Sequence, residues 1–255
     1  WLTRRAYRSP FSMVICTRDG SGGEQWMQQA LAADTPRQML INGVDLDDVE
    51  PLPVEIAAHL DGPATKVLFV ARLVDNKGCM AFMDGFLDAL GQALGELQAI
   101  VVGDGPYREP MRAAAAKRGA LDMVSFVGQI AHDQVVAVQQ RCDIYISLNP
   151  MGNLTNANLE ALAAGACMIV PASPLENGLD PDIDVLGPNE TVWRIASADD
   201  AAGLVGALLR LHRDPAERQR RGAAAAAMGR RLLSSWDERI SQEIAMLEEL
   251  AGTGP

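Results

Sequence analysis

The chain has 255 residues, of which 48% are hydrophobic and 22% are charged, so it has the composition of a globular protein with a sizeable core. Its net charge of −11 opposes binding to DNA or RNA, and we therefore exclude nucleic acid as a partner. No apolar run reaches the roughly 18 residues of a membrane span, and Trp1 in place of an initiator methionine indicates a fragment.

The first part of the chain is typical of the end of an α/β domain. Its expected elements are a strand over 11–17, a helix over 23–33, a strand over 38–41 and a turn over 42–45. Pro51, Pro53 and Pro63 then punctuate the sequence. We interpret residues 1–45 as the remnant of a preceding domain and residues 46–64 as a linker.

Residues 65–234 alternate short apolar runs with longer helical patterns. The expected strands cover 67–71, 97–102, 124–127, 143–147 and 168–170. The expected helices between them cover 82–94, 106–118, 132–141 and 157–164, and Gly165 is a suitable residue to end the last one. This alternation predicts an α/β fold with a doubly wound, Rossmann-like parallel sheet and helices on both faces. In such sheets ligands bind beyond the carboxyl ends of the strands.

Three helices are expected in the C-terminal part of the chain, over 199–212, 215–233 and 235–255. Ser235 and Glu238 have the spacing of a capping box that starts the last helix. The apolar residues of that helix form one stripe from Trp236 to Leu250. The stripe fits either a helix packed on its own domain or a helix that crosses to the preceding domain.

The loop over 72–78 joins a strand to a helix and carries Arg72, Lys77 and Gly78. An arginine fork and a lysine five residues apart can converge on one diphosphate. Gly78 would let the backbone approach an anion at the helix N-terminus. Two solvated surface charges are the alternative interpretation of the same pattern.

Residues 103–106, Gly-Asp-Gly-Pro, form a second junction between a strand and a helix. Gly103 and Gly105 have the spacing of a dinucleotide fingerprint, but Arg108 stands where the third glycine belongs. We therefore exclude a nicotinamide site and expect a tight turn near the ligand crevice.

A third junction, over 152–165, leads from a glycine and small polar residues into a short helix. Thr155 or Asn156 can serve as the N-cap, and the free amides there form a cradle for an anion. Glu160 lies about one turn inside the helix, where its carboxylate could accept hydrogen bonds from two sugar hydroxyls. Ordinary turn chemistry for the asparagines and an exposed helix position for Glu160 are the alternatives.

The cysteines and histidines do not have the pattern of a metal site. Cys16, Cys79, Cys142 and Cys167 form no C-x-x-C pair, and each lies in or beside an apolar run. Buried free thiols are typical of a reducing compartment, so we expect a cytoplasmic protein. The three histidines are scattered along the chain, which makes a metal site improbable.

The three junctions, in this order, resemble glycosyltransferase family 4 and its retaining GT-B relatives. The resemblance runs from the Asn-Gly-Val-Asp turn at 42–45, through the junctions, residues 124–129 and Asp143, to Trp236 in the last helix. It covers about 200 residues and corresponds to the donor-binding C-terminal domain of the family. It implies the GT-B fold for the complete protein.

The resemblance also implies roles for the candidate residues. Arg72 and Lys77 would be the catalytic cations that hold the donor diphosphate and neutralise the leaving group. Glu160 would bind the ribose hydroxyls, and Ile130 would lie against the base. The other donor-binding residues would be Gly103, Gly105, Gly128, His132, Asn153, Thr155, Asn156 and Ala157. No metal or other cofactor would be required.

For the complete protein, the resemblance implies a retaining hexosyltransferase of polysaccharide biosynthesis. Its donor would be a nucleotide diphosphate sugar, and its acceptor would be a glycan or a lipid-linked molecule bound through the N-terminal domain. The full-length protein could associate peripherally with a membrane. Because only the end of the N-terminal domain is expected here, we expect the fragment alone to be inactive.

Gly152 departs from the family pattern. A carboxylate that contacts the transferred sugar is expected eight residues before Glu160, and Gly152 stands there. Asn149, Asn153 or Asn156 would have to make the sugar contact instead. Gly152 therefore favours an alternative function, a catalytically degenerate nucleotide-binding module of the same fold. A nucleotide-sugar epimerase would need acidic catalytic residues that we cannot place.

Overall fold

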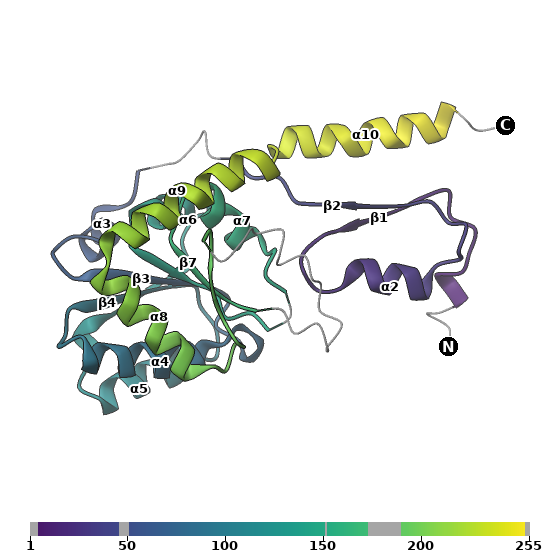
Figure 1. Ribbon diagram of the computed structural model, residues 1–255. Coiled ribbons are helices and arrows are strands. Elements are labelled where there is room, and N and C mark those ends of the chain that lie inside the picture. Colours follow the sequence, from purple (N-terminus) through teal and green to yellow (C-terminus); the bar gives the residue numbers. More distant parts are fainter. Residues whose placement is uncertain (1–4, 46–50, 151, 173–189, 253–255) are drawn as a thin grey trace.

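The computed structural model describes residues 5–45, 51–150, 152–172 and 190–252 (Figure 1). Its main body contains a parallel sheet in the order β5-β4-β3-β6-β7-β8. The strands are β3 (Thr65–Val70), β4 (Leu97–Val102), β5 (Val124–Gly128), β6 (Ile144–Ile146), β7 (Met168–Pro171) and β8 (Trp193–Ile195). The order reverses between β3 and β6, and this is where a doubly wound sheet opens a crevice at its carboxyl edge.

Helices cover both faces of this sheet (Figure 1). One face carries α4 (Cys79–Gln92), α5 (Arg108–Lys117) and α8 (Ala201–Arg213), and the other carries α3 (Val54–His59), α6 (His132–Arg141), α7 (Asn156–Ala163) and α9 (Pro215–Leu232). Two short 3-10 helices cover Asp75–Lys77 and Leu121–Met123. The predicted fold class is confirmed, whereas β8 was not predicted and α3 lies within the segment expected to be a linker.

The two cores follow from the alternation of side chains along each strand. Phe69 of β3 stacks on Phe82 of α4 with ring centroids 4.5 Å apart, and both are buried in one cluster with Leu208 of α8. Its neighbour Leu68 points to the opposite face, where it is buried in a second cluster with Leu159 of α7. The sheet is therefore apolar on both sides, as a buried parallel sheet requires.

Residues 5–45 form a smaller part, which we call the N-terminal unit. Its strands β1 (Val14–Thr17) and β2 (Arg37–Leu40) pair in parallel, and α2 (Gly23–Ala30) connects them. Figure 1 shows this unit beside the main body, below the last helix. The three elements agree with the predicted strand, helix and strand; β1 and α2 are shorter than expected, and β2 is displaced by one residue.

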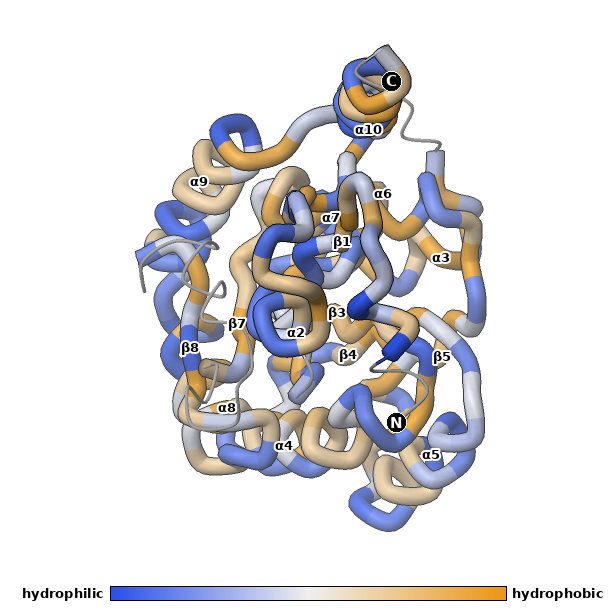
Figure 2. The backbone as a smooth tube through the Cα atoms, turned by 90° about the vertical axis from the view of Figure 1, so that its right-hand side faces the viewer, coloured by the Kyte–Doolittle hydropathy of each residue, from blue (hydrophilic) through white to orange (hydrophobic). Residues whose placement is uncertain are grey.

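The last helix, α10 (Trp236–Gly252), begins at the predicted capping box. The Glu238 amide donates to Ser235 Oγ, and the Ser235 amide donates to Glu238 Oε2, both at 3.1 Å. The helix extends away from the six-stranded sheet and along the N-terminal unit (Figure 1), and Figure 2 shows it end-on at the edge of the molecule. Much of its apolar stripe is exposed: Ile240 by 48%, Ile244 by 49% and Leu247 by 59%.

The turn at 42–45 joins the N-terminal unit to the start of α10. The Val44 amide donates to the Ser234 carbonyl at 2.9 Å, and the Trp236 amide donates to Asp45 Oδ1 at 3.0 Å. Gly43 has no room for a side chain, because a Cβ atom there would lie 2.6 Å from the Trp236 Cα atom. Close backbone packing therefore explains the glycine of this turn.

Candidate functional site

A pocket of about 360 Å³ opens at the carboxyl ends of β3 and β6, where the strand order reverses. It is lined by Phe69, Val70, Ala71, Arg72, Lys77, Ser147, Leu148, Asn149, Thr155, Asn156 and Ala157. The structure thus brings together five of the predicted site residues, which come from two separate junctions. We call this cavity the switch-point pocket.

Arg72 reaches the pocket because the loop after β3 is held against the next junction. The Leu73 amide donates to the Asp104 carbonyl at 2.9 Å. A Cβ atom on Gly103 would overlap the Ala71 carbonyl, and one on Gly105 would overlap the Leu73 carbonyl. Both glycines therefore allow the 103–106 junction to pack closely against the loop that carries Arg72, and neither lines the switch-point pocket.

Gly78 and Lys77 place the second cation in the same pocket. Gly78 has φ +68°, and a Cβ atom there would lie 2.5 Å from Leu148 Cβ. This glycine therefore serves the close approach of the loop to the end of β6, a role that differs from the predicted approach to an anion. Burial, together with the nearby charge of Arg72, lowers the pKa of Lys77. A lysine charge that is disfavoured by burial and by a neighbouring arginine is stabilised by an anionic ligand.

The N-terminus of α7 forms the opposite wall of the pocket. Thr155 is the N-cap, and its Oγ1 atom accepts a hydrogen bond from the Asn158 amide at 3.4 Å. Asn156 is exposed, whereas Asn153 is buried and its Nδ2 atom donates to the Pro171 carbonyl at 3.4 Å. Of the four predicted donor-binding residues in this segment, Thr155, Asn156 and Ala157 line the pocket and Asn153 does not.

Glu160 lies deeper along α7 and is buried, with 5% of its surface exposed. Its Oε1 atom is 3.4 Å from Nε2 of the exposed His132, which stands at the start of α6. Burial raises the pKa of Glu160, and His132 opposes that shift. An exposed helix glutamate is thus the wrong interpretation, although neither residue lines the switch-point pocket.

Gly128 and Ile130 belong to the segment that leads from β5 into α6. Gly128 has φ +83°, and Ile130 is half-buried against the second core cluster. The predicted base-binding segment therefore ends next to the His132–Glu160 pair. It adjoins the switch-point pocket through α7, and it does not line the pocket.

Gly152 packs against the loop that follows β1. Its φ is +148°, and a Cβ atom there would lie 2.5 Å from the carbonyl carbon of Gly20. The Leu154 amide donates to the Asp19 carbonyl at 3.1 Å, which joins the two loops. A side chain at position 152 is therefore excluded by the N-terminal unit, and this contact between distant residues could not be read from the local sequence.

Ser147, Leu148 and Asn42 lie at the pocket although no binding role was predicted for them. Ser147 and Leu148 line the pocket because they follow β6 directly. Their position just after a predicted strand was the sequence feature from which a binding role could have been predicted. Asn149, one of the three candidates for the sugar contact, also lines the pocket, and its Nδ2 atom donates to the Gly152 carbonyl at 2.6 Å. Asn42 of the N-terminal unit reaches the pocket rim through a 2.7 Å hydrogen bond to Asn156.

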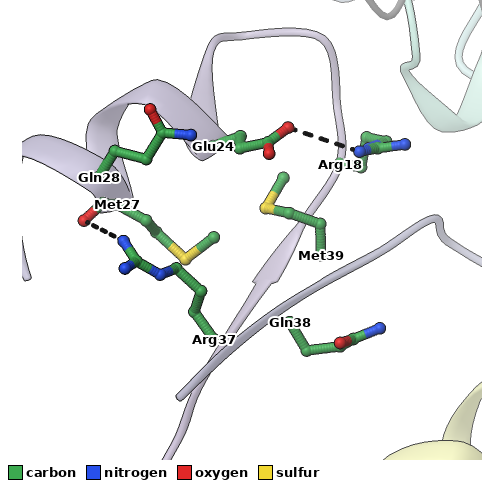
Figure 3. Close-up of a pocket in the computed structure, with 7 residues that line it drawn as sticks. All are labelled: Arg18, Glu24, Met27, Gln28, Arg37, Gln38 and Met39. Atoms are coloured by element: carbon green, nitrogen blue, oxygen red, sulfur yellow. Dashed lines mark hydrogen bonds and ion pairs between the residues drawn. The ribbon is translucent and has the colours of Figure 1, made fainter. Parts of the chain in front are cut away.

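Another pocket, of about 460 Å³, lies within the N-terminal unit (Figure 3). Arg18 and Arg37 both line it, together with Met27 and Met39. Arg18 pairs with Glu24 at 3.6 Å, and Arg37 donates to the Met27 carbonyl at 3.4 Å. Because protein groups already engage both cations, this pocket is a weaker anion site than the switch-point pocket.

Two further properties of the described residues bear on the site. Within the part of the chain that the structure describes, no three His, Cys, Asp or Glu side chains group as a metal site would require. In the same residues, no helix has the length and apolar character needed to cross a membrane. All four cysteines are free thiols; Cys79 and Cys167 are buried as predicted, whereas Cys16 and Cys142 are only half-buried.

Comparison with known proteins shows the family of the chain. Residues 57–228 match the family described as glycosyl transferases group 1. The phosphatidyl-myo-inositol mannosyltransferase of Mycobacterium leprae is 29% identical over 231 residues, which are 90% of this chain and 58% of that protein. A 2-deoxystreptamine N-acetyl-D-glucosaminyltransferase of Streptomyces fradiae is 33% identical over 183 residues, or 69% of this chain and 41% of that protein.

Solved structures show the same fold. Sucrose-phosphate synthase from Thermosynechococcus elongatus superposes with a TM-score of 0.75 at 21% identity, over 98% of this chain and 61% of that one. HepE of Anabaena in complex with UDP and glucose superposes with a TM-score of 0.71 at 17% identity, over 93% of this chain and 63% of that one. This chain therefore spans about 60% of the length of each of these proteins.

Proposed function

Because the chain belongs to the family of group 1 glycosyl transferases, we propose that it binds the nucleotide diphosphate sugar from which the complete protein transfers a hexose. The acceptor would be a glycan or a lipid-linked molecule, bound through an N-terminal domain of which residues 5–45 form the end. In this proposal the donor occupies the switch-point pocket, and the protein acts in the cytoplasm.

One observation carries the proposal: Arg72, Lys77 and the N-terminus of α7 line one pocket. A nucleoside diphosphate bound there would meet two side-chain cations and the positive end of a helix dipole. The same groups would stabilise the negative charge that develops on the diphosphate when the glycosidic bond breaks. They would neutralise the diphosphate without a metal ion, so the proposal includes no cofactor.

The His132–Glu160 pair would take the ribose side of the donor. The buried Glu160 carboxylate can accept hydrogen bonds from both ribose hydroxyls. In the structure this carboxylate is paired with His132, so a ribose that took the place of the His132 side chain would bind to the Glu160 oxygens. The base would then lie towards Gly128 and Ile130. We propose retention of configuration for the transfer and assign no enzymatic nucleophile.

Position 152 has no room for a side chain, so it cannot carry the carboxylate that would contact the transferred sugar. This favours a second candidate function, a nucleotide-binding module without transferase activity. Radiolabelled donor added to the full-length protein with glycan and lipid acceptors separates the two functions. Label in an acceptor supports the transferase. Saturable binding of donor without any transfer to acceptor or water would support the module.

A further inference from the structure

Asn42 is linked to a residue of the switch-point pocket that is distant in the sequence. Its Nδ2 atom donates a 2.7 Å hydrogen bond to Oδ1 of Asn156, which is the first residue of α7. The other residues of the 42–45 turn contact the start of α10 instead. One turn of the N-terminal unit therefore makes two separate contacts, and only the Asn42 side chain reaches the pocket.

The N-terminal unit also holds the loop that leads into α7. The Asp19 carbonyl accepts from the Leu154 amide, and Gly20 packs against Gly152. The adjacent Arg18–Glu24 ion pair joins the end of β1 to the first turn of α2 (Figure 3). The approach to Asn156 is thus held by the loops that follow both strands, at the carboxyl edge of the N-terminal unit's parallel sheet.

The direction of the Asn42 hydrogen bond has a chemical consequence. A side-chain amide has one oxygen that accepts and one NH₂ group that donates. Because Asn42 occupies the oxygen of Asn156, the NH₂ group of Asn156 is the end left to bind a ligand. In a pocket that also holds Arg72 and Lys77, a donor is the group that an anion requires.

We propose that Asn42 is a positioning residue for the donor site, which orients the Asn156 amide so that its NH₂ group donates to the diphosphate of the bound nucleotide. This inference rests on the proposed function of the same pocket. It assigns to the N-terminal unit a part in donor binding that acts through Asn156, in addition to whatever the unit contributes to acceptor binding.

Calorimetric titration of the full chain with UDP and with GDP tests the inference. Asn42→Ala and Asn156→Ala should each weaken binding about 3- to 10-fold, the scale of one hydrogen bond to a charged ligand. The double variant should bind within about 2-fold of Asn156→Ala, because Asn42 acts through Asn156. Asp45→Ala is the matched control: it breaks the contact with Trp236 and should change affinity less than about 2-fold.

A second measurement is independent of nucleotide. The side-chain NH₂ resonances of Asn156, assigned by their loss in Asn156→Ala, should shift in Asn42→Ala and stay in place in Asp45→Ala. Thermal unfolding of each variant shows whether the fold is retained.

Several outcomes overturn the inference. These are unchanged nucleotide affinity in Asn42→Ala, full additivity in the double variant, or an equal loss in Asp45→Ala. Failure of the proposed function has a different result: the wild-type chain would bind neither UDP nor GDP. The NMR shift could then persist, but it would position no ligand, and the inference would fall with the function.

Discussion

Gly20 and Gly152 lie back to back across the contact between the N-terminal unit and the main body. A Cβ atom at either position would lie within 2.8 Å of backbone atoms of the other loop. Both residues have positive φ, +81° and +148° respectively. This contact explains why no carboxylate stands eight residues before Glu160: the space belongs to the backbone of the opposite loop.

Gly152→Ala should destabilise the chain, because the new methyl group meets Gly20 and the backbone conformation disfavours an L-residue. We expect a loss of about 1–3 kcal/mol in the free energy of unfolding, measured by urea denaturation. Gly91→Ala in α4 is the control, since nothing lies within 4 Å of its added Cβ atom. That control should be neutral or more stable. Equal stability of Gly152→Ala and the wild type would contradict the packing described.

Glu160→Gln should weaken binding of UDP and GDP but not of their 2′,3′-dideoxy analogues, because the carboxylate is proposed to hold the ribose hydroxyls. We expect a loss of about 1–3 kcal/mol in calorimetry with the natural nucleotides. An equal loss with both kinds of ligand would assign Glu160 to a structural role.

The pH dependence of nucleotide binding should report the same carboxylate. Burial raises the pKa of Glu160, so the group protonates at a higher pH than an ordinary glutamate. Affinity should therefore fall as the pH is lowered through this raised pKa, and Glu160→Gln should lose that part of the profile. If nucleotide affinity depended on pH in the same way in Glu160→Gln and in the wild type, Glu160 would not be a ligand of the nucleotide.

The alternation of strands and helices was predictable because it depends on local sequence patterns. The position of Arg72, Lys77 and Thr155 at one pocket was predictable for the same reason: each follows a recognisable strand in a fold whose ligands bind at the carboxyl edge. Strand β8 was missed, because its sequence Trp-Arg-Ile is interrupted by a charged residue, whereas the equally short β6 is a continuous apolar run. The roles of Gly103 and Gly152 also escaped prediction, because they depend on backbone contacts between segments far apart in the sequence.

The exposed stripe of α10 should promote self-association of the chain. Ile244→Glu and Leu247→Glu should each reduce the apparent mass in light scattering at high protein concentration, because they interrupt an apolar face. Since both side chains are about half exposed or more, stability should change by no more than about 0.5 kcal/mol. A monomeric wild-type chain at all concentrations would contradict this prediction.

The measurement that tests the central claim most directly is calorimetric titration of UDP and GDP into the wild-type chain, Arg72→Ala and Lys77→Ala. Arg210→Ala on α8, an exposed cation that does not line the switch-point pocket, serves as the control. The account predicts that each pocket variant loses about 1–3 kcal/mol of binding free energy while the control binds like the wild type. Unchanged affinity of both pocket variants for both nucleotides would show that the diphosphate does not bind between Arg72 and Lys77.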